Sequence, residues 1–417
     1  MLKYIFKKLE NSEYPLLGPN ITALKFWGLI LPKELLTKCL YIFFHLTVII
    51  FTATEYAEIW FVKYDMNLLL TNIKITLLAT VSVSKVTSFL INQDKWLNII
   101  NYVNKADKVQ RNGDDAKRDI INRYTKYSRK ITYFYIILMY TTVVIVMSQP
   151  IYKYLFSESY RENVRNGTEN YAQVVSSWVP FDKNTVTGHI FACLYQSYAA
   201  IYGGGWITSF DTNAIVIMVF FRGELEMLRI DSRNLFGSEN LLVSKEEFKK
   251  RLKNCYQRHV DLLKYSYLFD SCLSPIMFLY VIVCSVMLCA TAYQITIETS
   301  TTQRFLTAEY LIFGIAQLFM YCWHSNDVLY VSKDLSLGPY ESVWWSRDVS
   351  EQKDVNILVD QFKKIIVFSA GPFTNITVTT FISVSSFFKI FFFLPLDFKI
   401  NYLKLSNRSS IITLKNK

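Results

Sequence analysis

The 417-residue chain is short of charge and of the residues that build soluble catalytic or metal sites. Only 19% of its residues are charged, against 52% that are hydrophobic, and it has four histidines. Its seven cysteines include no CxxC pair, which argues against a zinc site or a disulfide framework. No Ser-His-Asp set, phosphate loop or paired-carboxylate site stands outside the apolar runs. We therefore expect no enzyme, no metal site and no cofactor. No cleavable signal peptide is visible either, because the first long apolar run starts only near Cys39.

What the chain does have is apolar runs that approach or exceed the ~20 residues needed to cross a bilayer. They predict an all-α membrane protein with seven transmembrane helices, at about 39–61, 66–92, 131–150, 188–221, 265–296, 304–331 and 373–396. The fourth span contains Gly203-Gly204-Gly205, where the backbone bends or a neighbouring helix approaches closely. The fifth is expected to kink at Pro275. Lys74 and Lys85 are expected to snorkel out of the lipid.

The basic residues are distributed unevenly among the segments between these spans. They occur on the leader (1–38) and, ten each, on 93–130 and 222–264, whereas 151–187 has four. A net charge of +11 would suggest nucleic acid for a soluble protein, but this pattern fits membrane topology, so no nucleic-acid partner is expected. The positive-inside rule predicts a cytoplasmic N-terminus and, after seven spans, an extracellular C-terminus. The leader is expected to lie partly in the membrane interface. The sequon at Asn166 then lies outside, where glycosylation occurs.

This orientation is inverted relative to G-protein-coupled receptors. The chain also has no Asp-Arg-Tyr after its third span and no Asn-Pro-x-x-Tyr in its last one. A G-protein-coupled-type chemoreceptor is therefore the runner-up within membrane proteins. A membrane transporter should show internal repeats, and a membrane enzyme should show clustered titratable groups; the sequence has neither pattern.

The chain resembles the insect odorant receptor family at several short motifs. They are Tyr340 with Trp344-Trp345, Lys363-Lys364, the run Ser369-Ala370-Gly371-Pro372-Phe373, Thr379-Thr380-Phe381, and Trp178-Val179-Pro180-Phe181-Asp182 before the fourth span. It lacks the Thr-Tyr…Gln-Phe ending of the related gustatory receptors. A gustatory-type channel is therefore kept only as an alternative. Its second cytoplasmic loop is too short for the co-receptor, so it resembles an odour-tuning subunit.

The resemblance implies a ligand-gated, non-selective cation channel: a hetero-tetramer with the odorant co-receptor in the plasma membrane of a sensory neuron dendrite. It also implies that a small volatile odorant binds in the outer half of the bundle, among spans two, three, four and six. Membrane lipid is a further expected partner of the protein. On those spans we expect the pocket to use Leu69, Asn72, Ile73, Thr76, Met139, Thr142, Val143, Val146, Ile190, Leu194, Ser197, Tyr198, Ile201, Tyr310 and Phe313. Tyr198 and Tyr310 are the strongest single candidates. Packing in the core is the alternative role for each residue.

The final stretch is predicted to contain an anchor helix at about 352–370, a break at Gly371-Pro372 and a polar last span. The anchor helix has one apolar face, and the resemblance implies that it joins subunits. The expected anchor interface is Tyr340, Trp344, Val355, Leu358, Phe362 and Ile366. Hydroxyl and small apolar groups suit a weakly selective pore, so we expect pore lining by Thr377, Thr379, Thr380, Ser383 and Val384. Packing within one subunit is the alternative for both sets.

Residues 385–417 differ from the odorant-receptor domain expected at 1–384. Of these 33 residues, 28 are Phe, Ile, Leu, Lys, Asn or Ser, and none is Gly, Ala or Val. Val384-Ser385 is also what the opening bases of an intron would encode. We hypothesise that this low-complexity tail is a read-through or mis-joined exon; sequencing the transcript tests this.

Overall fold

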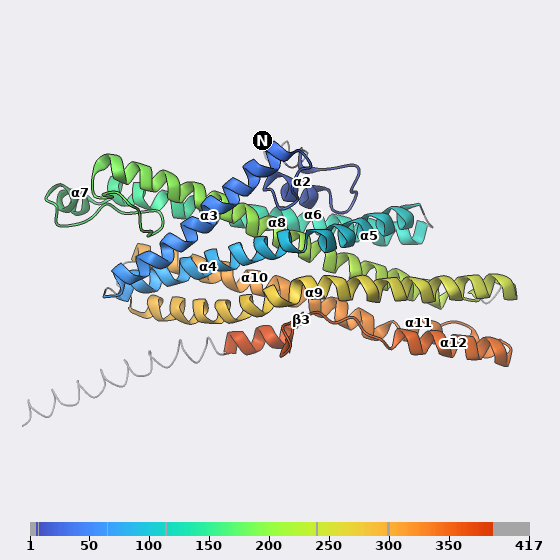
Figure 1. Ribbon diagram of the computed structural model, residues 1–417. Coiled ribbons are helices and arrows are strands. Elements are labelled where there is room, and N and C mark those ends of the chain that lie inside the picture. The colour runs from blue at the N-terminus through green and yellow to red at the C-terminus, as the bar shows by residue number, and fades with distance from the viewer. Residues whose placement is uncertain are drawn as a thin grey trace, which may run out of the picture.

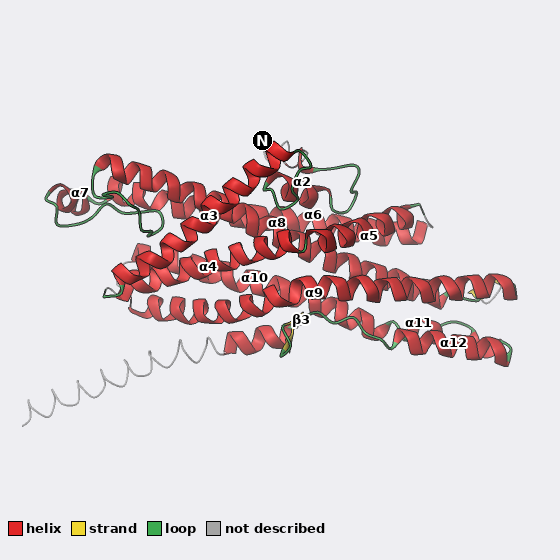
Figure 2. Cartoon of the chain, in the orientation of Figure 1, coloured by secondary structure: helices red, strands yellow, loops and turns green. Residues whose placement is uncertain are grey.

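The computed structural model describes residues 6, 8–64, 66–112, 115–238, 241–297 and 301–386, and this part of the chain is almost entirely helical (Figures 1 and 2). The helices are α2 (Gly18–Phe26), α3 (Leu35–Val62), α4 (Met66–Ile91), α5 (Gln93–Arg111), α6 (Asp115–Phe156), α7 (Glu158–Arg165), α8 (Val186–Arg233), α9 (Lys245–Ile297), α10 (Thr301–Asp334), α11 (Leu337–Tyr340) and α12 (Val349–Phe362). Two small hairpins pair β1 (Gly237–Ser238) with β2 (Leu241–Leu242), and β3 (Ser369–Ala370) with β4 (Thr374–Asn375).

The long helices run side by side in an elongated bundle, with α2 lying across its middle (Figure 1). One end carries α7 together with the end of α3 and the start of α10; we call it the α7 end. The opposite end carries α12, the end of α5 and the turn between α8 and α9, and we call it the α12 end.

Helix α8 is the centre of the bundle. It contacts α6, α10, α9, α4 and α2. Every residue of α8 from Gly204 to Phe221 is buried, including Asp211 and Asn213. A helix that is apolar almost all round has no solvent face, so the others pack around it on all sides.

Among the described residues, five helices are long and apolar enough to cross a membrane: Leu35–Val62, Leu68–Ile91, Lys117–Phe156, Val186–Arg233 and Lys245–Ile295. They overlap the first five expected spans, and Lys117–Phe156, Val186–Arg233 and Lys245–Ile295 extend well beyond the third, fourth and fifth. The sixth expected span lies on the 34-residue helix α10, and the seventh, 373–396, lies partly outside the described residues. The tail from 387 to 417 is outside them as well, so the exon hypothesis stays a prediction.

The basic segments between spans are helical rather than loops. Helix α5 and the first turns of α6 occupy 93–130, and the last turns of α8 and the first turns of α9 occupy most of 222–264. The leader also packs into the main core, where Leu17, Ile21 and Leu24 are at most 1% exposed, and its place in the membrane interface stays a prediction. The basic helices between the spans also have a buried apolar side, which on α5 is formed by Trp96, Ile99, Ile100 and Val103.

The last stretch breaks earlier than the sequence predicted. Helix α12 ends at Phe362, not near residue 370, and an extended segment leads to the β3–β4 hairpin. Gly371 forms its turn with φ of 66°, and helix resumes only at residues 378–386. The hairpin is held to α9, because Ser274 Oγ accepts from Gly371 N at 3.0 Å and Asp270 Oδ1 from Ser369 N at 2.7 Å.

Candidate functional site

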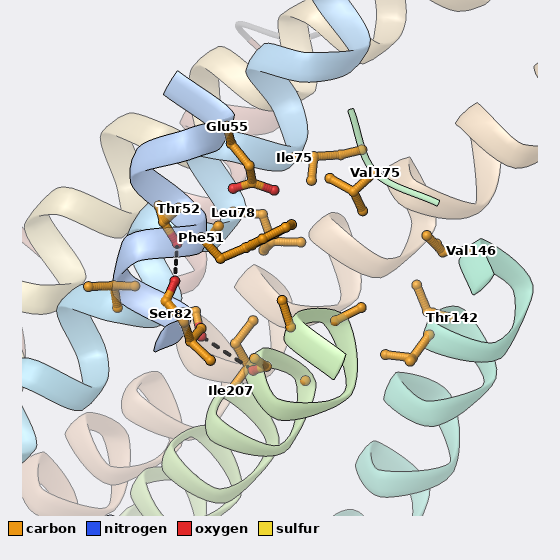
Figure 3. Close-up of a pocket in the computed structure, with 18 of the residues that line it drawn as sticks. Phe51, Thr52, Glu55, Ile75, Leu78, Ser82, Thr142, Val146, Val175 and Ile207 are labelled. Atoms are coloured by element: carbon orange, nitrogen blue, oxygen red, sulfur yellow. Dashed lines mark hydrogen bonds between the residues drawn. The ribbon is translucent and has the colours of Figure 1, made fainter. Parts of the chain in front are cut away.

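A cavity of about 110 Å³ lies towards the α7 end, lined mainly by α3, α4, α6 and α8 (Figure 3). Its walls are mainly aliphatic and small side chains. The lining residues are Val48, Phe51, Thr52, Glu55, Ile75, Leu78, Ala79, Ser82, Val83, Met139, Thr142, Val143, Val146, Val175, Ala199, Ala200, Gly203, Gly204 and Ile207.

Small residues on α8 create this space. The α8 side chains that face α6 occupy little volume and so leave space between the two helices. They are Ala199, Ala200, Gly203 and Gly204. A Cβ at Gly203 would meet nothing nearer than Ser82 Oγ at 3.9 Å. At Gly205 a Cβ would lie 2.2 Å from the Trp27 ring, so there α2 approaches α8 closely. The three-glycine run thus serves both cavity and close packing, and α8 passes through it as a continuous helix.

The segment before α8 covers the cavity, and Gln196 fixes it there. Gln196 is fully buried, and its Oε1 accepts from Val174 N at 3.0 Å and Val175 N at 3.3 Å. Its Nε2 donates to Gln173 Oε1 and Ser177 Oγ at 3.0 and 3.1 Å. This places Val175 over the cavity as a lid.

Two further contacts tie the same segment to its surroundings. Lys183 Nζ donates to Glu58 Oε1 of α3 at 2.7 Å. On α7, the Tyr160 hydroxyl accepts from Ala172 N at 2.6 Å, and burial raises the pKa of this phenol.

The structure places the predicted ligand residues in several locations. All four from the third span, Met139, Thr142, Val143 and Val146, line the cavity. Phe313 lines a smaller hollow between α4, α9 and α10. The side chain of Tyr310 lies outside the described part of the structure.

The predicted residues on α8 and α4 lie on other faces of these helices. Ile190, Leu194 and Ser197 line an open hollow against α6 and α7, and Ile201 is 37% exposed. Tyr198 packs towards α3, where its hydroxyl is 3.0 Å from Thr47 Oγ1. On α4, Thr76 Oγ1 donates to Asn72 Oδ1 at 2.9 Å, whereas the cavity is lined by Ile75, Leu78, Ala79, Ser82 and Val83. Leu69 and Ile73 are likewise absent from its lining.

None of the residues predicted to bind a ligand lies on α3. This helix supplies Val48, Phe51, Thr52 and Glu55 to the cavity. The available signal was Glu55, an acidic residue inside an apolar run, because such residues are costly in lipid and often functional.

One turn further into the bundle, Asp211 collects four donors. Its Oδ1 accepts from Lys85 Nζ and Tyr321 Oη, both at 2.6 Å. Its Oδ2 accepts from Tyr135 Oη and Gln317 Nε2, both at 2.5 Å. We call these five residues the Asp211 cluster; it joins α4, α6, α8 and α10. Lys85 is therefore fully buried in an ion pair and does not snorkel, and buried Lys74 likewise donates to Gln294 Oε1 of α9.

The cluster is stacked directly on the cavity. Lys85 lies one turn from Ser82, Tyr135 one turn from Met139, and Asp211 one turn from Ile207, so three cavity helices each contribute to both. Towards the other side, Lys85 Nζ lies 4.9 Å from the Tyr280 ring of α9. A change in cavity packing therefore has a short physical route to α9 and α10.

The residues expected to line a pore lie together at the end of the described chain. Thr377, Thr379, Thr380, Ser383 and Val384 line one open groove beside the β3–β4 hairpin and Val281 of α9.

The expected anchor residues divide into two groups. Val355, Leu358 and Phe362 are fully buried and Ile366 is 2% exposed, because they pack inside their own chain; Phe362, for instance, meets the His259 ring at 5.0 Å. Tyr340 is 44% exposed and packs edge-on against half-buried Trp344. Asn166 is exposed at the end of α7.

Comparison with known proteins gives a consistent result. The family model described as 7tm Odorant receptor matches residues 65–388. Odorant receptor Or2 of Anopheles gambiae is 19% identical over 89% of this chain and 94% of its own. The Odorant receptor coreceptor of the same species is 23% identical over 39% of this chain and 35% of its own.

A solved structure shares the fold. It is the insect olfactory receptor OR5 from Machilis hrabei in complex with eugenol, with a TM-score of 0.76 and 16% identity, covering 95% of this chain and 98% of that one. Because the family model covers well over half of the sequence, the chain belongs to the seven-transmembrane odorant receptor family.

Proposed function

We propose that this odorant receptor is a tuning subunit in which a small volatile molecule occupies the cavity among α3, α4, α6 and α8. The observation that carries the proposal is the cavity itself: a mainly apolar hollow between four helices, with Val175 held over it by the hydrogen bonds of Gln196. Small-ligand sites are concave and apolar with a few placed polar groups. A cavity of about 110 Å³ is comparable with the ~150 Å³ space that binds benzene in another protein.

The proposed response is the opening of a non-selective cation channel formed with the odorant co-receptor in the plasma membrane. The Asp211 cluster supports this, since it connects the cavity helices to α9 and α10, which hold the final segment. The hydroxyl-rich groove of Thr377, Thr380 and Ser383 would line the pore. Since Val355, Leu358, Phe362 and Ile366 hold α12 to its own chain, exposed Tyr340 and neighbouring Trp344 are the better candidates for contact with a partner subunit.

We further propose a cytoplasmic N-terminus and an extracellular α7 end, on the strength of the charge distribution. Exposed Asn166 would then carry a glycan. An epitope tag at the N-terminus should be inaccessible in intact cells, and Asn166→Gln should abolish a glycosidase-sensitive shift in gel mobility. An accessible N-terminal tag would overturn this orientation and favour a G-protein-coupled-type receptor.

The functional test is co-expression with an odorant co-receptor and recording of cation current during application of a panel of small apolar volatiles. At least one should evoke current in the pair. Gly203→Leu should abolish the response while surface labelling persists, because a side chain there projects into the cavity without a backbone clash. A pair that reaches the surface yet stays silent across a broad panel would contradict the proposal.

A further inference from the structure

The hydroxyl groups in the cavity wall are already used. Thr52 Oγ1 donates to Val48 O at 3.1 Å, and Ser82 Oγ donates to Gly203 O at 3.3 Å (Figure 3). Thr142 Oγ1 lies 2.5 Å from Glu309 Oε1. A ligand therefore finds these three donors engaged within the protein, and they do little to set what the cavity prefers.

Glu55 is different. Its side chain extends from α3 at one end of the cavity, next to Ile75 and Val175 (Figure 3). The residue is 1% exposed, and its Oε2 has no hydrogen-bond partner within the described part of the chain. Leaving a buried acceptor unsatisfied costs free energy, so an unpartnered carboxyl oxygen in a cavity wall indicates that something else satisfies it.

A second buried glutamate on α3, Glu58, does have hydrogen-bond donors for its carboxyl group. Glu58, one turn along the same helix, is also buried, but its Oε1 accepts from Lys183 Nζ at 2.7 Å and from Ser176 Oγ at 3.1 Å. Lys183 is thus engaged at Glu58. The contrast between the two glutamates lies in the donor that each receives, not in their burial.

We infer that the cavity selects small, mostly apolar molecules carrying one hydrogen-bond donor, a hydroxyl or an amino group, which donates to Glu55. This inference rests on the proposed ligand-binding role of the cavity. A hydroxyl suits the carboxyl in either charge state, because an ionised carboxylate and a neutral acid both retain an acceptor oxygen; an ammonium group requires the ionised form, and a neutral acid could itself donate to an acceptor-only ligand. A hydrocarbon fills the same volume but leaves Oε2 unpaired, and sites built around a buried polar group discriminate strongly against such analogues.

The test uses four compounds of one size and shape: 3-methylbutan-1-ol, 3-methylbutan-1-amine, 3-methylbutanal and 2-methylpentane. They present a hydroxyl, an amine, an acceptor alone and a hydrocarbon. Dose–response curves are recorded for the receptor with its co-receptor in the same cells. The alcohol or the amine should act at concentrations at least about tenfold lower than the hydrocarbon. An aldehyde as potent as the alcohol would show that Glu55 is a neutral acid that donates, and would overturn the preference for a donor. Equal potency across the four compounds would overturn the inference.

Two variants separate the hydroxyl from the amine. Glu55→Gln keeps an acceptor oxygen but cannot be charged, whereas Glu55→Met has a similar length and no strong acceptor. For a hydroxyl ligand, Glu55→Gln should retain the preference and Glu55→Met should lose it. For an amine, both should lose most of it, because the charged form of the carboxyl is then required. A preference that survives Glu55→Met would also refute the inference.

Glu58→Gln is the matched control, a glutamate on the same helix that does not line the cavity. It should lower the amount of receptor at the surface and leave the ratio of alcohol or amine potency to hydrocarbon potency unchanged. Because the readout is a ratio within one cell population, altered expression does not mimic the effect. A wild-type pair that is at the surface and silent to all compounds refutes the proposed function itself; a pair that responds without donor preference refutes only the role of Glu55.

Discussion

Lys85 Nζ and Asp211 Oδ1 lie 2.6 Å apart at the centre of the bundle, and both side chains are fully buried. The carboxylate is saturated, since two donors reach each of its oxygens. Burying two charges costs several kcal/mol per ion, and only close pairing with additional hydrogen bonds offsets that cost. The pair is therefore sensitive to the loss of either partner, and it lies where the cavity helices meet α10.

The first prediction is a double-mutant cycle on this pair. Lys85→Met or Asp211→Asn alone leaves one uncompensated buried charge and should destabilise the receptor by about 3–5 kcal/mol, seen as loss of surface receptor and a lower melting temperature in detergent. The double variant removes both charges, and the Asn carbonyl can still accept from Tyr321 while its amide group donates to the Tyr135 hydroxyl, so it should recover much of the loss. If the two single effects simply add in the double variant, the pair is not coupled.

Lys363 and Asp360 on the surface provide the control. They form an ion pair of 2.8 Å, but their side chains are 64% and 72% exposed. Exposed pairs of this kind contribute about 0–1 kcal/mol. Lys363→Met and Asp360→Asn should therefore leave surface level and melting temperature nearly unchanged.

The second prediction compares two glycines two residues apart. A Cβ at Gly203 has room, so Gly203→Ala should be tolerated, and gain about 0.5–1 kcal/mol of helix stability. A Cβ at Gly205 would lie 2.2 Å from Trp27 Cε2, so Gly205→Ala must displace α2 and should cost about 1–3 kcal/mol. Melting temperatures of the purified variants measure both. Equal effects at the two positions would show that α2 does not pack on α8 in this way.

The third prediction concerns the lid. Gln196→Leu removes the acceptor for Val174 N and Val175 N and leaves buried amides unpaired, at a cost of about 1–3 kcal/mol. A loosened lid should speed the decay of current after the odorant is washed out. Gln257→Leu is the control, because Gln257 is exposed and donates to neighbouring Asp261 at 3.2 Å; its decay should match wild type. An unchanged decay in Gln196→Leu would mean that the lid does not control ligand exit.

The sequence predicted the number of early spans, and for α6 it predicted the cavity-lining face. The cavity-lining face of α8 was predicted wrongly, because the side chains of this helix are apolar and buried on almost every side. Hydrophobicity then separates buried from exposed but does not show which buried face meets a cavity. Met139 and Val143 were identifiable because α6 has an exposed side, whereas Ala199 and Gly203 are notable only for the volume that they leave empty.

Polar contacts between distant segments were beyond the sequence for a different reason. Lys85 and Asp211 are 126 positions apart, so their pairing depends on how α4 packs against α8. The end of α12 was misjudged because Ile366 continues the apolar periodicity although its segment is extended; its burial comes from tertiary packing, and its N–H donates to Ser332 Oγ at 2.9 Å instead of continuing the helix.

The last prediction concerns the turn that joins the extended segment to the final helix. Gly371 has φ of 66°, where a side chain is strained by about 1–2 kcal/mol, and a Cβ there would also lie 2.7 Å from Phe278 Cδ2 of α9. Gly167 has φ of 70°, but a Cβ there would meet nothing within 4 Å, so a side chain would cause backbone strain without a steric clash. Gly167→Ala should therefore be mild, and it keeps the Asn166 sequon. Gly371→Ala should shift the β3–β4 hairpin on Ser274 and reduce odorant-evoked current per surface receptor. If both variants pass normal current per surface receptor, the hairpin does not hold the final helix in its working position.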